Sequence, residues 1–507
     1  MLVKLKTLTL AGLEGELVDI EVDVHRGMPI FILVGLGDAA VQEAKVRVMS
    51  AIKNSGFFFP RGRVVINLAP ADLKKHGPRF DLPIALGILI ASGQLRVPEN
   101  LDKKIFAGEL SFTGELRGVS GVLPIAAAAV DFGFSEIFVP AENAEEASLI
   151  KAIRVFPVKD LQQISEHFST NEIPPFECSE FDLLKQEKIY ENDFAHVRGN
   201  ENARRSLEIA AAGGHNVLMT GPPGSGKTML AKAFATILPD LEINEALEIT
   251  KVYSIAGLTN EKNSLISNRP FRSVHHTASG IAIVGGGNPP RPGEISLAHR
   301  GVLFLDEFAE FPQKTLEVLR QPLEDGVVTI SRASGSCTFP AQLMLIAAMN
   351  PCPCGYLGDD QKECACSPFQ IIRYKNKISG PLLDRIDLHL FVPRVSFEKL
   401  AGIKLGESST EIRARVQKAR GAQQKRFKNL KINTNAEMSS PLVKKFCEIE
   451  EDALALLRSA VEQMNLSGRA FYRILKVART IADLDSSEKI KLDHLAESIQ
   501  YREKAED

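Results

Sequence analysis

The chain has 507 residues, of which 24% are charged and 44% hydrophobic, and its formal net charge is −2. This length accommodates two to four domains, and the small net charge excludes a global electrostatic attraction to nucleic acid or membrane, so any such binding must come from local patches. No apolar run reaches the ~18 residues that span a bilayer, and the first ten residues lack a signal-peptide core. We therefore expect a cytoplasmic protein with no membrane partner.

Residues 1–167 form the first predicted domain, which is of mixed α+β type. Apolar residues that alternate indicate strands, and apolar residues at helical spacing indicate helices. The expected strands cover residues 2–10, 15–24, 29–34, 64–68, 105–108 and 136–140. The expected helices cover 38–54, 82–92 and 122–130, and a hairpin is expected over 109–118. Residues 168–192 follow with Pro174-Pro175 and mixed charges, which predicts a linker.

A glycine-rich stretch follows the apolar run 217–220 in the second predicted domain, residues 193–394. It has the spacing of a P-loop between a strand and a helix. Its glycines let backbone N–H groups surround phosphate oxygens, Lys227 reaches the β and γ phosphates, and the Thr228 hydroxyl binds Mg²⁺. The predicted nucleotide-binding residues are Gly221, Pro222, Pro223, Gly224, Ser225, Gly226, Lys227 and Thr228. The pattern predicts ATP and Mg²⁺ as cofactors, and an incidental glycine-rich turn is the alternative.

Two adjacent acidic residues end the next buried-strand pattern, residues 301–305. At the carboxyl end of a strand, Asp306 is suited to hold the hydration shell of Mg²⁺ as a cofactor-binding residue. Glu307 is suited to polarise the attacking water as a catalytic residue. The alternative is a pair of N-cap acids for the following segment, where residues 312–323 predict one helix.

Four of the seven cysteines lie within fifteen residues, as two C-x-C pairs separated by nine residues. Such a set suits a tetrahedral thiolate site, for which Zn²⁺ is the default ion. The predicted ligands are Cys352, Cys354, Cys364 and Cys366. Reduced thiols or a disulfide are the alternatives. His275 and His276 also suggest a metal, but a structural or DNA-facing role is favoured because no third ligand stands at metal-site spacing.

Several basic residues are candidates for contact with DNA. Residues 326–341 predict a hairpin that turns at Ser334-Gly335, directly before the strand 343–349. Residues 395–507 predict a helical lid, and its segment 413–431 carries eight basic and no acidic side chains. Such a run is either a solvated face or a nucleic-acid contact, and a plain surface hairpin is the alternative for 326–341. The DNA-contact candidates are Arg269, Arg272, Arg332, Arg413, Lys418, Lys425 and Arg426.

Segments 68–72, 77–85, 108–111 and 114–119 resemble the C-terminal fold of Lon proteases, in the version found in Mg-chelatase-like proteins of the ComM (YifB) family. Lon proteases use a Ser–Lys dyad. Here Arg79 stands after Gly77-Pro78 where the serine belongs, and the segment at 121–126 has no lysine. Without nucleophile and base the serine mechanism cannot run, so the resemblance implies a proteolytically inactive Lon-like domain for oligomer or DNA contacts rather than an active protease.

The lead-in 193–201, the stretch 255–300 and the lid are similar to the same family, although many relatives would have Gln where Asn200 stands. The resemblance implies an α/β multidomain fold: the α+β Lon-like domain, an AAA+ αβα core with helix-2 insert and pre-sensor-1 hairpin, and the lid. It also implies further catalytic residues. These are Asn350 as sensor 1, Arg385 as an arginine finger acting on a neighbouring subunit, and Arg469 as sensor 2 in preference to Arg473. For Arg385 the alternative is a structural pair with Asp384 or Asp387, and Arg373 is then the next candidate finger.

The family resemblance implies a hexameric ATPase that promotes branch migration in natural transformation or recombination. Its partner would be branched or single-stranded DNA. The residues alone indicate less, namely a ring-forming ATPase, because a finger that acts in trans requires neighbours. Two other functions stay open. One is a Mg-chelatase-type ATPase that remodels a protein partner, and the other is a regulatory ATPase whose Lon-like domain docks proteins.

Overall fold

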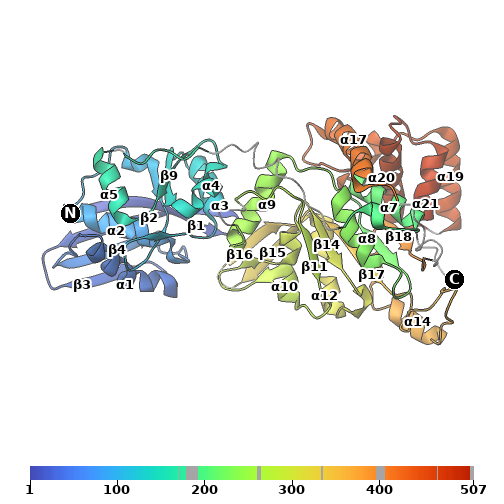
Figure 1. The fold of residues 1–507 in the computed structure, drawn as a ribbon, viewed down its shortest axis with the longest axis horizontal. Helices are drawn as coiled ribbons and strands as arrows, with labels where there is room; N and C mark the ends of the chain where they lie inside the picture. Colours follow the sequence, from blue (N-terminus) through green and yellow to red (C-terminus); the bar gives the residue numbers. More distant parts are fainter. Residues whose placement is uncertain are drawn as a thin grey trace.

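The chain is elongated, with the N-terminal unit at one end, a parallel sheet in the middle and a group of helices at the other end (Figure 1). The computed structural model describes residues 1–170, 172–177, 192–259, 264–332, 335–395, 406–464 and 466–502. Within these ranges, no helix combines the length and the apolar character that crossing a membrane requires.

The N-terminal unit begins with a four-stranded sheet in the order β1-β2-β4-β3. Its strands are β1 (Leu2–Ala11), β2 (Glu14–His25), β3 (Ile30–Val34) and β4 (Arg63–Ala69). Two helices pack with it, α1 (Ala39–Asn54) and α2 (Asp81–Ala91). Every residue of α2 is buried, which explains why its sequence is apolar on all sides rather than on one stripe.

A second, parallel sheet completes this unit in the order β5-β8-β9. Its strands are β5 (Lys104–Phe106), β8 (Glu136–Pro140) and β9 (Arg154–Val158). The helices that accompany it are α3 (Val122–Asp131), α4 (Ala144–Ser148) and α5 (Leu161–Thr170). The predicted hairpin is present as β6 (Glu109–Leu110) and β7 (Leu116–Arg117). The unit is mixed α+β, and α5 continues three residues past the predicted boundary at 167.

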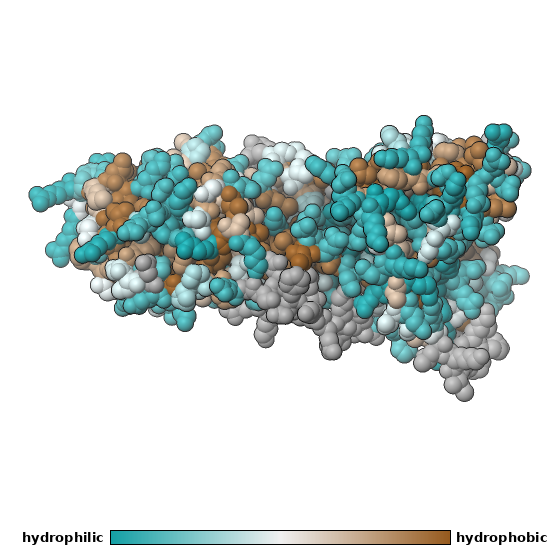
Figure 2. Space-filling model, turned by 90° about the horizontal axis from the view of Figure 1, so that it is seen from above, coloured by the Kyte–Doolittle hydropathy of each residue, from teal (hydrophilic) through white to brown (hydrophobic). Residues whose placement is uncertain are grey.

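The N-terminal unit is packed against the core through α3, α4 and helix α9 (Ile243–Ala256). An apolar cluster joins residues of both sides: Leu123, Leu149, Leu241, Ala246, Ile249 and Leu265. The buried Glu146 accepts hydrogen bonds from the backbone of Leu123 (3.1 Å) and the hydroxyl of Thr259 (3.3 Å). Burial raises the pKa of Glu146. The two units therefore share both apolar and polar contacts. In Figure 2, hydrophobic side chains gather over the N-terminal unit and this junction.

Five parallel strands form the core sheet in the order β11-β14-β17-β10-β18. They are β11 (Phe271–Val274), β14 (Val302–Leu305), β17 (Met344–Met349), β10 (Val217–Thr220) and β18 (Leu388–Phe391). Three of them are almost continuously apolar, as expected of strands covered on both faces. Helices α7 (Glu201–Gly213) and α8 (Lys227–Phe234) pack near β10. Because the strands are parallel, the loops that follow them meet at one edge of the sheet, and the loops that precede them meet at the other.

The predicted single helix over 312–323 is wrong: the segment forms two short helices, α12 (Gln313–Glu317) and α13 (Arg320–Asp325). Pro322 explains the break. Its ring would clash with the carbonyl four residues earlier in a continuous helix, at Val318, whereas it is tolerated in the first turn of α13.

The predicted hairpin is present as β15 (Val327–Arg332) and β16 (Gly335–Pro340). Arg332 pairs with Gly335 at the end of the two strands, and Ser334 of the predicted turn lies outside the described residues. The insert before β14 contains α10 (Gly280–Val284), the strand pair β12 (Gly285–Gly286) and β13 (Arg291–Pro292), and α11 (Glu294–Leu297). A Cβ atom on Gly285 would lie 3.0 Å from Cδ1 of Ile330, so the insert and the hairpin pack closely.

The C-terminal region is helical throughout its described elements. These are α17 (Ser409–Phe427), α18 (Ser440–Phe446), α19 (Glu451–Gln463), α20 (Gly468–Leu484) and α21 (Leu492–Gln500). Helices α17 and α20 pack on α7 of the core, and a small core of their own lies among α18 to α21. Two shorter helices, α14 (Pro368–Lys375) and α15 (Gly380–Leu383), precede β18.

Candidate functional site

The P-loop follows β10 and ends where α8 begins at Lys227. Two of its glycines are required by geometry. A Cβ on Gly221 would lie 2.2 Å from the carbonyl oxygen of Val392, and Gly226 has φ +89°, a conformation that L side chains rarely adopt. The loop can therefore approach β18 closely and turn its backbone N–H groups toward an anion at the start of α8.

Lys227 lies inside this loop. Its Nζ donates to the carbonyl oxygens of Gly221 (2.7 Å) and Pro222 (3.0 Å), and to Oδ1 of Asn350 (3.4 Å). Burial lowers the pKa of Lys227, and the nearby Asp306 carboxylate opposes that shift. Asn350 directly follows β17, the strand between β10 and β14. The fold thus brings Lys227, Asp306 and Asn350, which were predicted separately, to one edge of the sheet.

Thr228 and Asp306 meet directly, since the Thr228 hydroxyl donates to Oδ2 of Asp306 over 2.8 Å. The other oxygen of Asp306 accepts the backbone N–H of Glu307 (2.9 Å). A hydroxyl and a carboxylate beside a phosphate-binding loop are donors that Mg²⁺ prefers, and the ion usually keeps several waters there. These two residues therefore fit the predicted Mg²⁺ site.

Glu307 is held in an unusual backbone conformation with φ +51°. Its side chain is half exposed, and Oε2 lies 2.9 Å from Nδ1 of His276. The His276 ring lies against His275, with ring centroids 4.1 Å apart. The sequence did not predict this pairing. The available signal was the place of His276, two residues after Val274, the last residue of β11, which pairs with β14.

A cavity of about 610 Å³ opens beside the P-loop. Its walls come from the P-loop, the segment before α7 and the end of the core domain. The lining residues include His196, Val197, Arg198, Asn200, Met229 and Arg394. Concave sites of this size accommodate small ligands, and this one adjoins the phosphate-binding loop. The predicted lead-in 193–201 thus borders the nucleotide site, and Arg394 was not foreseen.

The four predicted cysteines are brought together, and in the described part of the chain they form the one cluster of metal-ligand type. Cys352 Sγ lies 3.4 Å from Cys354 Sγ and 3.6 Å from Cys364 Sγ, and all four sulfurs lie within 4.8 Å of one another. A tetrahedral zinc ion with Zn–S bonds of about 2.3 Å separates its sulfurs by about 3.8 Å, so the donor set fits. A Cβ on Gly355 would lie 2.7 Å from Pro223, which places this cluster against the P-loop.

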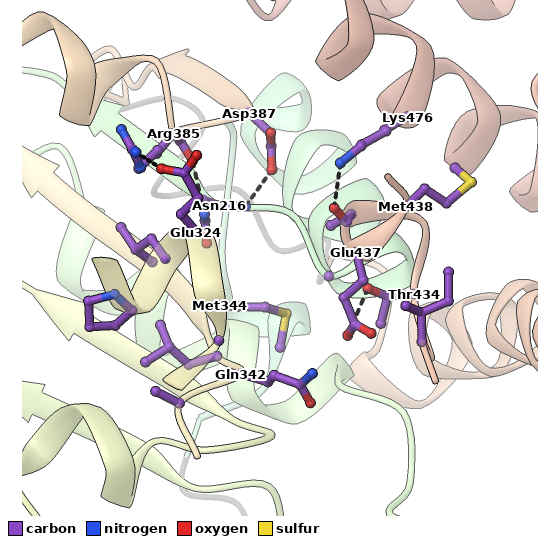
Figure 3. A pocket seen from close by; sticks show the side chains of 18 of the residues that line it. Asn216, Glu324, Gln342, Met344, Arg385, Asp387, Thr434, Glu437, Met438 and Lys476 are labelled. Atoms are coloured by element: carbon purple, nitrogen blue, oxygen red, sulfur yellow. Dashed lines mark hydrogen bonds and ion pairs between the residues drawn. The ribbon is translucent and has the colours of Figure 1, made fainter. Parts of the chain in front are cut away.

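A second cavity, of about 660 Å³, lies at the opposite edge of the core sheet (Figure 3). We call it the arginine pocket. It is lined by residues that precede all five parallel strands, by α13 and by the lid. Its basic lining residues are Arg269, Arg300, Arg385, Arg420, Arg469, Arg473 and Lys476. None of its lining residues is shared with the cavity beside the P-loop.

Arg385 is 6% exposed and forms an ion pair with Glu324. Its Nη1 donates to the carbonyl of Pro381 (2.6 Å), whereas its buried Nε has no hydrogen-bond partner among the described residues. Burial lowers the pKa of Arg385, and the neighbouring arginines add to that effect. The backbone is fixed by Asn216, whose side chain donates to the Arg385 carbonyl (2.9 Å). The partner of Arg385 is thus Glu324 and neither Asp384 nor Asp387, the two residues named in the structural alternative.

The two sensor-2 candidates differ in what they contact. Arg473 donates to Oδ1 of the buried Asp387 over 2.6 Å, and this pairing helps hold the pKa of Asp387 far below its usual range against the opposing effect of burial. Arg469 stands at the start of α20, half exposed, and its Nη2 lies 3.3 Å from Oε1 of Glu324. Arg473 is therefore committed to an internal pair, while Arg469 shares the carboxylate that also binds Arg385.

The two cavities lie at opposite ends of β10. Asn216 and Asp387 precede β10 and β18 and line the arginine pocket, whereas the P-loop follows β10. Four residues of β-strand span about 13 Å. Arg385 therefore lies too far from the P-loop of its own chain to touch a γ-phosphate bound there.

Three of the predicted DNA contacts have partners within the chain. Arg269 donates to the carbonyls of Pro239, Asp240 and Arg300 and pairs with Glu245 at 2.7 Å. Arg272 binds both oxygens of Glu294, and Arg426 binds both oxygens of Asp483. Each of these guanidinium groups is paired with a carboxylate of its own chain, which leaves less of its charge available to DNA.

The basic run 413–431 contains both buried and exposed side chains. Arg420 is buried and donates to the carbonyl of Ala211, whereas Lys418 and Lys425 are exposed and Arg413 is partly exposed on α17. The side chain of Arg332 lies outside the described residues. The spacing of basic residues therefore overestimates the charge that α17 offers to solvent.

Comparisons with known proteins agree with this geometry. Residues 193–400 match the family described as magnesium chelatase, subunit ChlI. Residues 20–143 match subunit ChlI of Mg-chelatase, and residues 406–502 match the magnesium chelatase subunit ChlI C-terminal family. Fold, site and matches together define a Mg-chelatase-like AAA+ ATPase.

The particular family follows from full-length relatives. The chain is 44% identical over 499 residues to the competence protein ComM of Haemophilus influenzae and 43% identical over 497 residues to YifB of Escherichia coli. Each comparison covers 97% of this chain and 95% of the relative. A remote similarity, 21% over 479 residues, links it to 54% of the DNA replication licensing factor Mcm6 of Drosophila melanogaster. The chain belongs to the ComM/YifB family.

Proposed function

We propose that the protein hydrolyses ATP at sites shared between adjacent copies in a ring. The observation that carries this proposal is the distribution of the site over two edges of one sheet. Lys227, Thr228, Asp306, Glu307 and Asn350 lie at the carboxyl edge, whereas Arg385 and Arg469 line a pocket at the amino edge. Only a second chain can place such arginines against a nucleotide bound in the P-loop.

The residues at the carboxyl edge have distinct tasks in this reaction. The P-loop N–H groups and Lys227 bind the β and γ phosphates. Asn350 and Glu307 orient the attacking water, and the Glu307 carboxylate polarises it by accepting a hydrogen bond from it. Thr228 and Asp306 would hold Mg²⁺, which supplies charge neutralisation when bound. Arg385 and Arg469 of the neighbouring copy stabilise the negative charge that develops on the transferred phosphoryl oxygens.

We infer further that hydrolysis drives movement on DNA, as a helicase or branch-migration motor in natural transformation or recombination, and that the ring is a hexamer. Support comes from the names of two relatives, a competence protein and a replication licensing factor. The close packing of insert and hairpin also supports it, because paired loops can grip a phosphate backbone. Arg332, Arg413, Lys418 and Lys425 are the remaining candidates for DNA contact.

A second candidate function is the remodelling of a protein partner by a Mg-chelatase-type ATPase. It is favoured by the three chelatase family matches, which together extend from residue 20 to residue 502. In either function we propose the division into residues 1–167, 168–192, 193–394 and 395–507. The first of these is a Lon-like domain without protease activity, in which Arg79 donates to the carbonyl of Ser120 (3.3 Å) in the place of a nucleophile.

The rate of ATP hydrolysis, measured with and without forked or four-way DNA, tests the motor. We expect DNA to stimulate the rate and labelled strands to be displaced. A rate that is indifferent to DNA, with no strand displacement, would overturn the motor and favour the remodelling function. A rate per chain that does not fall on dilution would overturn the shared site.

We also propose that the cysteine cluster holds a structural zinc ion. Elemental analysis of protein made with ample zinc should give one zinc per chain. Cys352→Ser should lose the ion and lower the melting temperature, whereas Cys447→Ser, at a cysteine outside the cluster, should keep it. Zinc-free native protein would overturn this assignment.

A further inference from the structure

Glu324 is the shared partner of Arg385 and Arg469 in the arginine pocket, and Figure 3 shows its pair with Arg385. Arg385 Nη2 pairs with Oε2 of this carboxylate, and Arg469 Nη2 lies 3.3 Å from Oε1. The two arginines come from the core and from the lid, 84 positions apart in the sequence, and the carboxylate comes from α13. One side chain thus determines where both guanidinium groups point.

The charge around Glu324 is unbalanced. The pKa of Arg385 is lowered by its burial and by the proximity of Arg469, Arg320 and Arg473. Arg320 pairs with Glu317, and Arg473 pairs with Asp387, which leaves one half-exposed carboxylate for Arg385 and Arg469. The buried Nε of Arg385 also has no partner among the described residues. A triphosphate, which carries more charge and more acceptor oxygens than one carboxylate, would compete effectively for these donors.

Glu324 is also tied to the hairpin. It lies in the last turn of α13, Gly326 caps that helix with φ +67°, and β15 starts at Val327. The N–H of Ala341, after the second hairpin strand, donates to the Gly326 carbonyl over 2.8 Å. Only two residues separate the carboxylate from the first hairpin strand, so a tilt of the hairpin displaces Glu324.

We propose that Glu324 is a positioning residue that holds Arg385 and Arg469 within their own chain until the hairpin is loaded. A polyanion that binds the hairpin would tilt it and so displace Glu324 from both arginines. Arg385 and Arg469 would then be available to the triphosphate bound by the adjoining second copy of this chain. This inference rests on the proposed shared ATPase site. It adds the contact through which occupancy of the hairpin sets the hydrolysis rate.

The test compares Glu324→Gln with Glu448→Gln, a control that removes a half-exposed ion pair with Lys489 in the lid. Hydrolysis is measured for the full chain with and without forked DNA. We expect Glu324→Gln to raise the DNA-free kcat about fivefold, the factor that corresponds to loss of one partly exposed ion pair, and to reduce the stimulation by DNA by the same factor. The control should leave both values unchanged, and melting temperatures verify that both variants fold.

Adding Glu324→Gln to a chain that already carries Arg385→Ala and Arg469→Ala separates positioning from a general structural effect. If Glu324 acts through these two arginines, the addition changes nothing. A DNA-free kcat of Glu324→Gln equal to that of the unmodified chain would overturn the inference alone, as would a fivefold rise that persists when both arginines are replaced. An unmodified chain that does not hydrolyse ATP would instead remove the proposed function itself.

Discussion

The two edges of the core sheet are built in opposite ways. At the carboxyl edge, Lys227 donates a hydrogen bond to Asn350, and Thr228 donates one to Asp306. At the amino edge, arginines surround a cavity of about 660 Å³, and two of them share one carboxylate. The first edge is arranged to bind a nucleotide, whereas the second has an excess of positive charge and needs an anion from outside its own chain. The comparison supports the proposal that one chain carries two different halves of a shared site.

The largest expected effect tests the carboxyl edge. Lys227→Ala removes the cation that contacts the β and γ phosphates, and we expect hydrolysis to fall by about 10³-fold, together with a loss of ATP affinity. Steady-state hydrolysis and nucleotide binding measure these changes. Lys232→Ala, at an exposed lysine of the same helix, is the control and should retain activity. Equal activity of the two variants would contradict the assignment of the P-loop.

The second test asks whether the two edges act in different chains, by mixing chains that carry a defect at one edge with chains that carry a defect at the other. Arg385→Ala should lower hydrolysis by about 10³-fold with unchanged ATP binding, because arginine fingers contribute roughly 10³ to 10⁵ in rate. Mixing Arg385→Ala chains with Lys227→Ala chains should restore part of the activity, since an intact P-loop then meets an intact arginine. Arg373→Ala, at an exposed arginine outside the arginine pocket, should stay active.

Absence of any restoration in the mixture, with each variant shown to assemble with the other, would contradict the shared site. Loss of activity in Arg373→Ala but not in Arg385→Ala would identify Arg373, in α14, as the arginine finger.

A smaller effect is expected for His276, which faces Glu307 at 2.9 Å. We expect His276→Ala to lower kcat by about tenfold with little change in KM, because the carboxylate loses the group that orients it and nucleotide binding does not involve it. His275→Ala is the matched control, since its ring contacts Thr277 and not Glu307. A change in KM alone would show that His276 acts on binding.

The smallest effect belongs to α17. Replacing the exposed Lys418 and Lys425 with Ala should weaken DNA binding a few-fold and reduce the slope of log K against log salt by about 1 for each phosphate that is no longer neutralised. Binding isotherms at several salt concentrations measure both quantities. An unchanged slope would indicate that this face of the lid is merely solvated and would confine DNA binding to the core.

The carboxyl edge was predictable because its motifs are local. A P-loop and an acidic pair that follow apolar runs must meet when the strands are parallel, since all the strand ends then lie at one edge. The cysteine cluster was predictable for a similar reason, as its four ligands lie within fifteen residues. The mixed α+β character of the N-terminal unit also followed from periodicity.

Local residue patterns were therefore enough to specify the nucleotide-binding edge, the cysteine cluster and most of the strands and helices along the chain. Which arginines are free to meet a partner depends instead on packing in three dimensions. Arg269, Arg272 and Arg426 resembled DNA contacts, but each is paired with a carboxylate 22 to 57 positions away. Likewise Glu324 joins Arg385 and Arg469 only through the packing of α13 against the lid. A charged side chain takes its role from the opposite charge that the fold brings to it, because residue spacing does not encode that neighbour.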